Sequence, residues 1–176
     1  KYYSIATGDS SAEVSLLEGN SGLKVVYYNQ GDAAWKSIPY STSTIGQSGC
    51  GPTSMAICIS TLSGKKITPR QTCQWAGSQG YYVKGAGSKH DVIPGLAKKY
   101  GVKCKGVGKN KPQIIQALKT GKLVVAIMSA GHFTSGGHFI VLTGIKDGKI
   151  TVADCGSRQR TKQTWSLDLI VNESNS

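Results

Sequence analysis

The chain has 176 residues, of which 39% are hydrophobic, and 21 Lys and Arg against 9 Asp and Glu give it a formal net charge of +12. This length suits one compact domain with a core of its own. No apolar run approaches the roughly 20 residues that cross a bilayer, so we expect no transmembrane segment. The start, "KYYSIATGDSS", lacks the apolar segment of a secretion signal, and we expect a processed chain because it opens at Lys1 without Met.

The positive charge favours polyanionic surroundings such as nucleic acid, an anionic membrane or an acidic cell-wall polymer. Its densest stretch, "KKYGVKCKGVGKNK" at 98–111, holds six lysines, one aromatic residue and no arginine. Proteins that bind nucleic acids usually add arginine forks and stacking aromatic rings. We therefore expect no nucleic-acid partner and favour a solubilising charge or one directed to an anionic cell-wall polymer.

Residues 1–23 are expected to form an N-terminal arm or linker, since they are rich in Ser and Gly and hold three of the nine acidic residues. Within them, "AEVSLLEG" at 12–19 predicts a short helix. A single domain is expected over 24–176, and its first strand is predicted from "LKVVYYNQ" at 23–30. A turn-rich stretch then leads to Cys50.

After Cys50 the apolar residues recur at helical spacing from Met55 to Leu62, which predicts a helix that ends at Gly64. Three further helices are predicted at 68–80, where Thr68 is the cap and Pro69 lies in the first turn, at 91–101 and at 111–121.

Four strand-like segments follow, and Asp147-Gly148 predicts a tight type I′ hairpin between the second and the third of them. Helices therefore come first and an antiparallel sheet follows, which predicts an α+β fold. The four segments are "KLVVAIMS" (122–129), "HFIVLTGI" (138–145), "KITVADC" (149–155) and "TWSLDLIV" (164–171).

Cys50 lies between two glycines in "IGQSGCGPTSMA" and directly precedes the predicted helix. Unpaired N–H groups and the helix dipole at such a position stabilise a thiolate, the reactive form of cysteine. The flanking glycines let the chain turn sharply and let a substrate carbonyl approach, as an acyl-transfer nucleophile requires. A cysteine packed inward at a helix start is the alternative.

The five cysteines include no CxxC pair, which argues against a disulfide framework and a structural zinc site, although a single bridge stays open.

Three histidines are candidates for the base that a thiolate nucleophile needs. His138 opens an apolar strand and is favoured, whereas His132 lies in a loop-like stretch and His90 is expected at the surface or as a helix cap. The alternatives for His138 are a solvent-bonded side chain and a metal pair with His132, whose spacing is not a familiar ligand pattern.

Asp154 ends the strand "KITVAD" and is the natural acceptor for the second ring nitrogen of His138. In a regular hairpin, however, Val141 would face Asp154 and Ser157 would face His138, an offset of roughly 10 Å along the strand. Direct contact therefore requires a bulge, for instance at Gly144, or bent strand ends.

An oxyanion intermediate needs a donor besides the backbone N–H of Cys50. Gln47 is close to Cys50 in the sequence, whereas Gln30 ends a predicted strand and could be brought alongside by the intervening loop. Either glutamine could equally be an exposed turn residue, so the residues alone leave this choice open.

Three segments, "VVYYNQGDAAW", "GCGPTSMAICISTLSGKKITP" and "GHFIVLTGIKDGKITVAD", together resemble the stand-alone C39-like cysteine peptidases of bacteria. The resemblance spans about 23–157 and implies a papain-like fold, with N-terminal helices packed on a C-terminal antiparallel sheet. It also implies catalytic roles for four residues, which are Cys50 as nucleophile, His138 as general base, Asp154 as orienting acid and Gln30, rather than Gln47, as oxyanion donor.

The resemblance implies a secreted or cell-surface bacterial enzyme, a thiol hydrolase that cleaves a peptide or amide bond without a metal or an organic cofactor. Its substrate would be a protein or peptide, including a leader peptide, or the peptide part of peptidoglycan. The family usually continues the acid with Pro, whereas Cys155 follows Asp154 here, and one hypothesis is that this second thiol pairs oxidatively near the site. The alternative from another class is a non-catalytic binding module on the same fold.

Overall fold

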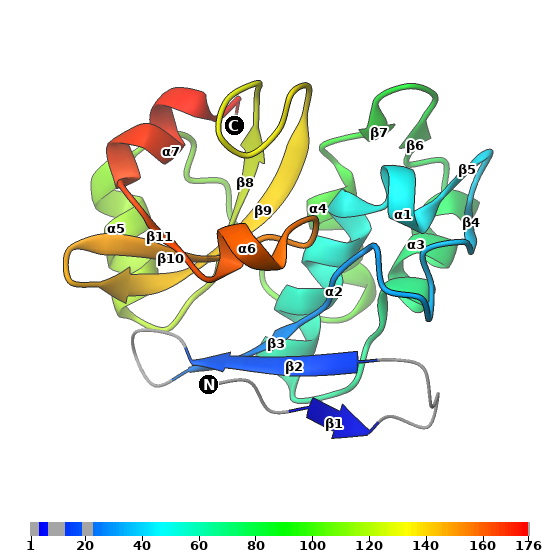
Figure 1. Cartoon of the computed structure of the whole chain (residues 1–176), viewed down its shortest axis with the longest axis horizontal. Coiled ribbons are helices and arrows are strands. Elements are labelled where there is room, and N and C mark those ends of the chain that lie inside the picture. The colour runs from blue at the N-terminus through cyan, green and yellow to red at the C-terminus, as the bar shows by residue number, and fades with distance from the viewer. Residues whose placement is uncertain (1–3, 7–12, 19–22, 176) are drawn as a thin grey trace.

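The computed structural model describes residues 4–6, 13–18 and 23–175, and it shows a helical half beside a sheet half (Figure 1). The helices are α1 (Ile45–Ser48), α2 (Cys50–Ser63), α3 (Pro69–Ser78), α4 (Val92–Lys99), α5 (Lys111–Lys119), α6 (Arg158–Thr161) and α7 (Leu167–Glu173). The strands are β1 (Ser4–Ala6), β2 (Glu13–Glu18), β3 (Lys24–Tyr27), β4 (Pro39–Tyr40), β5 (Ser43–Thr44), β6 (Tyr82–Val83), β7 (Gly87–Ser88), β8 (Val124–Met128), β9 (His138–Lys146), β10 (Lys149–Ala153) and β11 (Thr164–Trp165).

Helix α2 forms the centre of the helical half, and every residue at 51–60 is buried. It ends at Gly64, whose φ of 70° is the left-handed cap conformation that glycine adopts readily. Thr68 caps α3 by accepting a hydrogen bond from the N–H of Gln71, and Pro69 occupies the first helical position. The predicted helices that correspond to α2, α3, α4 and α5 are confirmed.

Strands β8 to β11 form an antiparallel sheet in the order β11-β10-β9-β8. The hairpin between β9 and β10 turns at Asp147 and Gly148, whose φ angles of 52° and 76° fit a type I′ turn. Lys146 pairs with Lys149 across this turn. The predicted hairpin is therefore confirmed, as are the strands predicted at 122–129, 138–145 and 149–155.

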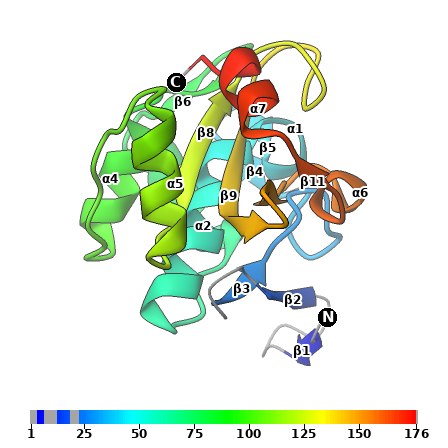
Figure 2. The ribbon, with the colours of Figure 1, turned by 90° about the vertical axis from the view of Figure 1, so that its left-hand side faces the viewer.

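Strand β9 is buried on both faces and belongs to two hydrophobic cores. Phe139 and Val141 pack in the core that contains α2, whereas Ile140 and Leu142 pack in a second core with residues of α5 and α7. Figure 2 shows α5 on one side of β8 and β9 and α2 on the other. Because successive side chains of a strand point to opposite faces, β9 joins the two halves. The predicted α+β class, with helices packed on a C-terminal antiparallel sheet, is confirmed.

The segment "TWSLDLIV", predicted as a strand, is mostly helical. Only β11 is extended, and Ser166 then caps α7 by accepting from the N–H of Leu169. Ile170 and Val171 are buried on one face of that helix. The prediction was wrong because the β-favouring composition outweighed the serine cap, which is the physical start signal of this helix.

The short helix predicted at 12–19 is also wrong, since Glu13–Glu18 forms β2 and pairs with β3. Pairing with a neighbouring strand overrides a local helical preference. Residues 1–3, 7–12 and 19–22 of the expected arm lie outside the described residues, so the boundary between the arm at 1–23 and the domain at 24–176 stays a prediction. No helix within the described part of the chain has the length and apolar character needed to span a membrane.

Candidate active site

Cys50 is the first residue of α2, and its side chain is half-buried. A Cβ at Gly49 would lie 2.7 Å from the carbonyl oxygen of Ile45, and one at Gly51 would lie 3.3 Å from Ser88. The packing of the chain itself therefore requires glycine at position 49 and leaves little room for a side chain at position 51, in addition to any clearance for a substrate. The N-terminal end of this 14-residue helix favours an anion, because its first N–H groups have no intrahelical acceptor.

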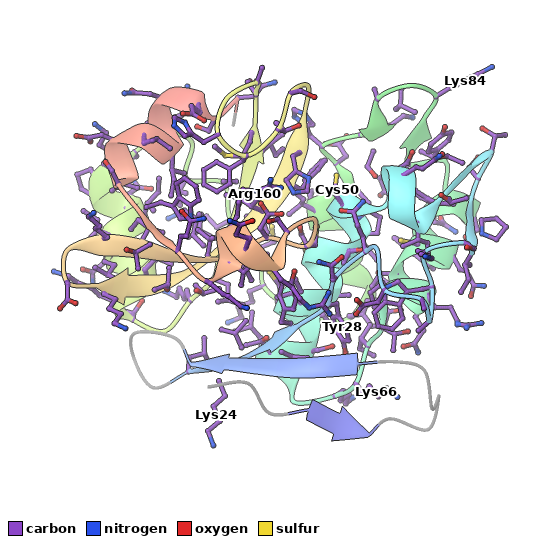
Figure 3. The ribbon with its side chains drawn as sticks, viewed as in Figure 1. Lys24, Tyr28, Cys50, Lys66, Lys84 and Arg160 are labelled. Atoms are coloured by element: carbon purple, nitrogen blue, oxygen red, sulfur yellow. The ribbon has the colours of Figure 1, made fainter. Side chains whose placement is uncertain are left out.

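The structure brings His138 and Asp154 into direct contact. Nε2 of His138 lies 2.6 Å from Oδ1 of Asp154. The His138 side chain is 10% exposed and that of Asp154 is 0% exposed, so water competes little for this bond. Figure 3 labels Cys50 on the helical side and Arg160 on α6.

The β9 strand carries one residue more than β10 beside Gly144. Gly144 pairs with Thr151, but the next pair along the hairpin is Leu142 with Val152. Thr143 is therefore the extra residue of a β-bulge. The bulge that a His138–Asp154 contact requires near Gly144 is present.

This bulge changes the face of the sheet to which Asp154 points. In a regular hairpin Asp154 would stand opposite Val141, and its side chain would point away from His138 because alternate residues face opposite sides. The extra residue shifts Asp154 to the position opposite Ile140, diagonal to His138 on the same face. Diagonal neighbours lie about 7–8 Å apart at Cα, close enough for an imidazole and a carboxylate to meet.

Three groups hold the carboxylate of Asp154. Oδ1 accepts from Nε2 of His138 and, at 2.9 Å, from the N–H of Gly156, while Oδ2 accepts from Nε of Arg160 at 2.6 Å. Burial by itself would raise the pKa of Asp154, but its interactions with His138 and Arg160 outweigh burial and lower that pKa. Asp154 is therefore an anion at neutral pH.

His138 is a cation at neutral pH for a related reason. Burial by itself would lower the pKa of His138, but the hydrogen bond to Asp154 and the nearby Cys50 side chain raise this pKa to about 9. Because Nε2 faces Asp154, Nδ1 is the ring nitrogen left to exchange a proton with Cys50. A protonated imidazole beside Cys50 stabilises the thiolate form.

Gln30 belongs to the buried surroundings of Cys50. Its backbone N–H donates to the carbonyl of Cys155 at 2.8 Å, and its side-chain Oε1 accepts from the Cys155 thiol at 3.2 Å. That same thiol lies 3.5 Å from the carbonyl oxygen of Cys50. Nε2 of Gln30 donates to the carbonyl of Gly46 at 3.0 Å. Gln47, by contrast, is exposed on α1, so the structure brings Gln30 and not Gln47 into this cluster.

The other two histidines have partners elsewhere. His132 is 60% exposed in the loop between β8 and β9, and its Nδ1 lies 2.6 Å from a carboxylate oxygen of Glu173. His90 is exposed, with its ring edge-on to Phe139 at 6.1 Å between centroids. Across the described residues, no group of three or more His, Cys, Asp or Glu could hold a metal ion, so the paired site of His132 and His138 gains no support.

All five cysteines are free thiols, so the single bridge that the sequence left open is not formed. Cys155 is completely buried, and burial together with the nearby Cys50 and Asp154 raises the pKa of its thiol well above the ordinary value. Oxidation proceeds through the thiolate, so this environment disfavours the oxidative pairing considered for Cys155.

The sequence alone did not point to Arg160 or Gly156, two of the three partners of the Asp154 carboxylate. The available signal was Ser157, which caps α6 by accepting from the N–H of Arg160. A serine at that position indicates a helix start. It does not indicate that the side chain of Arg160 folds back onto Asp154.

The sequence profile of the Peptidase_C39 like family matches residues 22–175. Among solved structures, a candidate C39-like peptidase from Bacillus anthracis has a TM-score of 0.50 at 16% sequence identity, over 92% of this chain and 96% of that chain, which shows a shared fold. No curated protein sequence matches the chain significantly. Since the family profile covers most of the sequence, the chain belongs to the Peptidase_C39 like family, and its α+β fold is papain-like.

Proposed function

We propose that this member of a peptidase family is a cysteine peptidase that cleaves a peptide or amide bond with Cys50, His138 and Asp154. The observation that supports this best is the buried His138–Asp154 pair at 2.6 Å. His138 is the first residue of β9, and this strand packs against α2, the helix that begins at Cys50. A nucleophile at a helix start and a base held by a third group are the parts that covalent acyl transfer needs.

The reaction proceeds by covalent catalysis. The thiolate of Cys50 attacks the carbonyl carbon of the scissile bond and forms a C–S bond, while the carbonyl oxygen becomes an oxyanion. The protonated His138 then gives its proton to the leaving amine, the C–N bond breaks, and an acyl-enzyme remains. His138 next takes a proton from water, and the resulting hydroxide equivalent hydrolyses the thioester and restores Cys50. Asp154 holds the ring of His138 and stabilises its charged form.

The oxyanion is held by two donors. The backbone N–H of Cys50 lies at the first position of α2, where helical N–H groups have no intrahelical acceptor. The side-chain amide of Gln30 is the second donor. Its Oε1 is occupied by the Cys155 thiol, so the Nε2 end is the one that donates. Nε2 donates to the carbonyls of Gly46 at 3.0 Å and Ile45 at 3.4 Å, and the longer of these bonds would give way to a substrate oxygen.

The substrate is a peptide, and the bacterial cell wall is one source of it. A net charge of +12 supports attraction to a wall that carries anionic polymers, and a secreted or cell-surface enzyme would meet such a wall. A protein or leader peptide is the other source. Clearing of purified wall suspensions without cleavage of casein or peptide libraries would favour the wall, and the reverse result would favour a peptidase acting on proteins.

The activity itself is tested by replacing the nucleophile. Cys50→Ala should abolish thiol-dependent turnover, while Cys104→Ala, which removes an exposed thiol, should keep it. Full turnover in Cys50→Ala would refute the mechanism.

The rate of iodoacetamide alkylation at neutral pH tests the His138–Cys50 pair without a substrate. Cys50 should react faster than an ordinary exposed thiol, and His138→Ala should slow this reaction. Cys104 is the reference thiol in the same molecule, because it is exposed. If Cys50 reacted no more readily than Cys104, the protein would be the non-catalytic binding module on the same fold.

A further inference from the structure

We propose that Arg160 is a positioning residue of this active site, which acts on the reaction through Asp154 and not on the substrate. Its Nε donates to Oδ2 of Asp154 at 2.6 Å, while Nε2 of His138 occupies Oδ1 at the same distance. This inference rests on the proposed function, in which Cys50, His138 and Asp154 carry out the reaction and Arg160 has no assigned part.

The two side chains bind different oxygens of one carboxylate, and they define its orientation together with the N–H of Gly156, which donates to Oδ1 at 2.9 Å. The Asp154 side chain is 0% exposed, so neither oxygen can turn to water for a hydrogen bond. A buried carboxylate oxygen without a donor is costly, and the group would rotate toward any donor within reach. Because Arg160 satisfies Oδ2, Oδ1 remains directed at His138.

The backbone around Arg160 is itself held in place. Its N–H donates to Oγ of Ser157 at 3.0 Å, and its carbonyl accepts from the indole N–H of Trp165 at 3.1 Å. These two bonds fix α6 between the end of β10 and β11. Arg160 therefore reaches Asp154 from a backbone with little freedom, as a group that fixes an active-site geometry must do.

The neighbouring Arg158 shows that the pairing is specific. Arg158 lies two residues earlier on the same short helix, and its guanidinium binds both carboxylate oxygens of Asp32, at 2.9 and 3.1 Å. Each arginine of α6 thus binds a different carboxylate. Figure 3 labels Arg160 on α6.

The charge of Arg160 and its hydrogen bond both stabilise the anionic form of Asp154. A cation beside Asp154 favours the anionic carboxylate, and at longer range it favours the thiolate of Cys50. Loss of that cation should therefore slow the reaction of Cys50 with an electrophile at neutral pH. Four other titratable or charged groups lie near Asp154, and two of them are His138 on β9 and Cys155 after β10. The third is Tyr27 on β3, whose hydroxyl donates to the backbone carbonyl of Asp154. The fourth is Arg158, whose guanidinium lies over the Tyr27 ring.

The test is the rate of Cys50 alkylation by iodoacetamide at neutral pH in three variants of the full chain. Arg160→Gln should slow this alkylation by roughly 10-fold. Arg160→Lys keeps a cation near Oδ2 and should restore most of the lost rate. Lys119→Gln removes the same charge from an exposed site at the end of α5 and should match the wild type. An Arg160→Gln rate equal to that of the wild type, or an equal loss of rate in Lys119→Gln, would overturn the proposal.

A measurement on the unaltered protein covers the case in which Arg160→Gln does not fold. The assigned Nε–H resonance of Arg160 should be protected from exchange with water, and it should move when His138 loses its proton, at a pH near 9. A resonance that stays constant through the His138 titration would also overturn the proposal. If wild-type Cys50 showed no dependence on His138, the proposed function itself would fail, so the two failures can be told apart.

Discussion

The hydroxyls of Thr143 and Thr151 lie 2.9 Å apart, at the point where β9 gains one residue over β10. This contact spans the bulge that places the Asp154 side chain on the same face of the sheet as His138. The geometry of the candidate site thus depends on one inserted residue in a hairpin, at a distance from the reacting groups.

Deleting Thr143 would test this dependence. A regular hairpin would turn Asp154 away from His138, and we expect activity to fall by at least about 10³-fold, as when a base loses its orienting carboxylate. The His138 pKa, followed by NMR, should fall from about 9 to the ordinary range for histidine or lower, because burial then acts without Asp154. The control is Thr143→Val, which loses the hydroxyl contact but keeps the extra residue and should retain most of the activity. A deletion variant with activity within tenfold of the wild type would contradict this account.

The His138–Asp154 pair should also make stability depend on pH. The pKa of His138 is raised from 6.5 to about 9 on folding, so the pair stabilises the folded state fully below pH 6.5 and loses this contribution as the pH rises to about 9. The effect is on the order of 3 kcal/mol at most. Denaturant unfolding of wild type and His138→Gln at several pH values should show the largest difference below pH 6.5 and a shrinking one toward pH 9. A difference that does not change over this window would exclude the charged pair.

Cys155 is expected to orient Gln30 and to remain reduced. In Cys155→Ala the Oε1 of Gln30 loses its donor, and kcat should fall by roughly 3- to 10-fold with little change in KM, as for one neutral hydrogen bond of about 1 kcal/mol. Cys155→Ser supplies another donor and should be closer to the wild type. After peroxide treatment, mass spectrometry should find oxidation at Cys50 and a reduced Cys155. A Cys50–Cys155 disulfide in that sample would restore the redox hypothesis.

Gly49→Ala should disturb the start of α2. The new Cβ would lie 2.7 Å from the backbone oxygen of Ile45, which cannot move aside as a flexible side chain would. We expect a loss of about 1–3 kcal/mol in the free energy of unfolding, together with slower alkylation of Cys50. Gly106→Ala is the matched control, because a Cβ there meets no atom within 4 Å. Equal stability and equal alkylation rates in the two variants would show that the close approach of Gly49 to Ile45 affects neither the stability of the protein nor the reactivity of Cys50.

Local sequence signals predicted most of the fold because they act over a few residues. The Thr68 cap, Gly64 after α2 and the Asp147-Gly148 turn each specify a boundary through their own backbone chemistry. One failure occurred where a pairing partner decides, since the segment Glu13–Glu18 became a strand because β3 lies beside it. The other failure, at 164–171, concerned a local signal, the Ser166 cap, which the β-favouring composition outweighed.

The candidate site divides in the same way. The helix start at Cys50 and the strand start at His138 follow from periodicity, so their placement could be predicted. The direction of the Asp154 side chain depends on a bulge, which Gly144 suggested but which only the pairing of β9 with β10 establishes. The Arg160 contact depends on how α6 folds back over β10, which is a tertiary effect.

The two buried faces of β9 have a consequence for heat inactivation. Because β9 packs in both cores, we expect its amide protons to exchange with water only when the whole molecule unfolds. His138 begins this strand, and α2, which begins at Cys50, packs directly against it. The loss of catalytic power on heating should therefore coincide with the global melting transition and should not precede it. Residual activity would then serve as a direct gauge of the folded fraction.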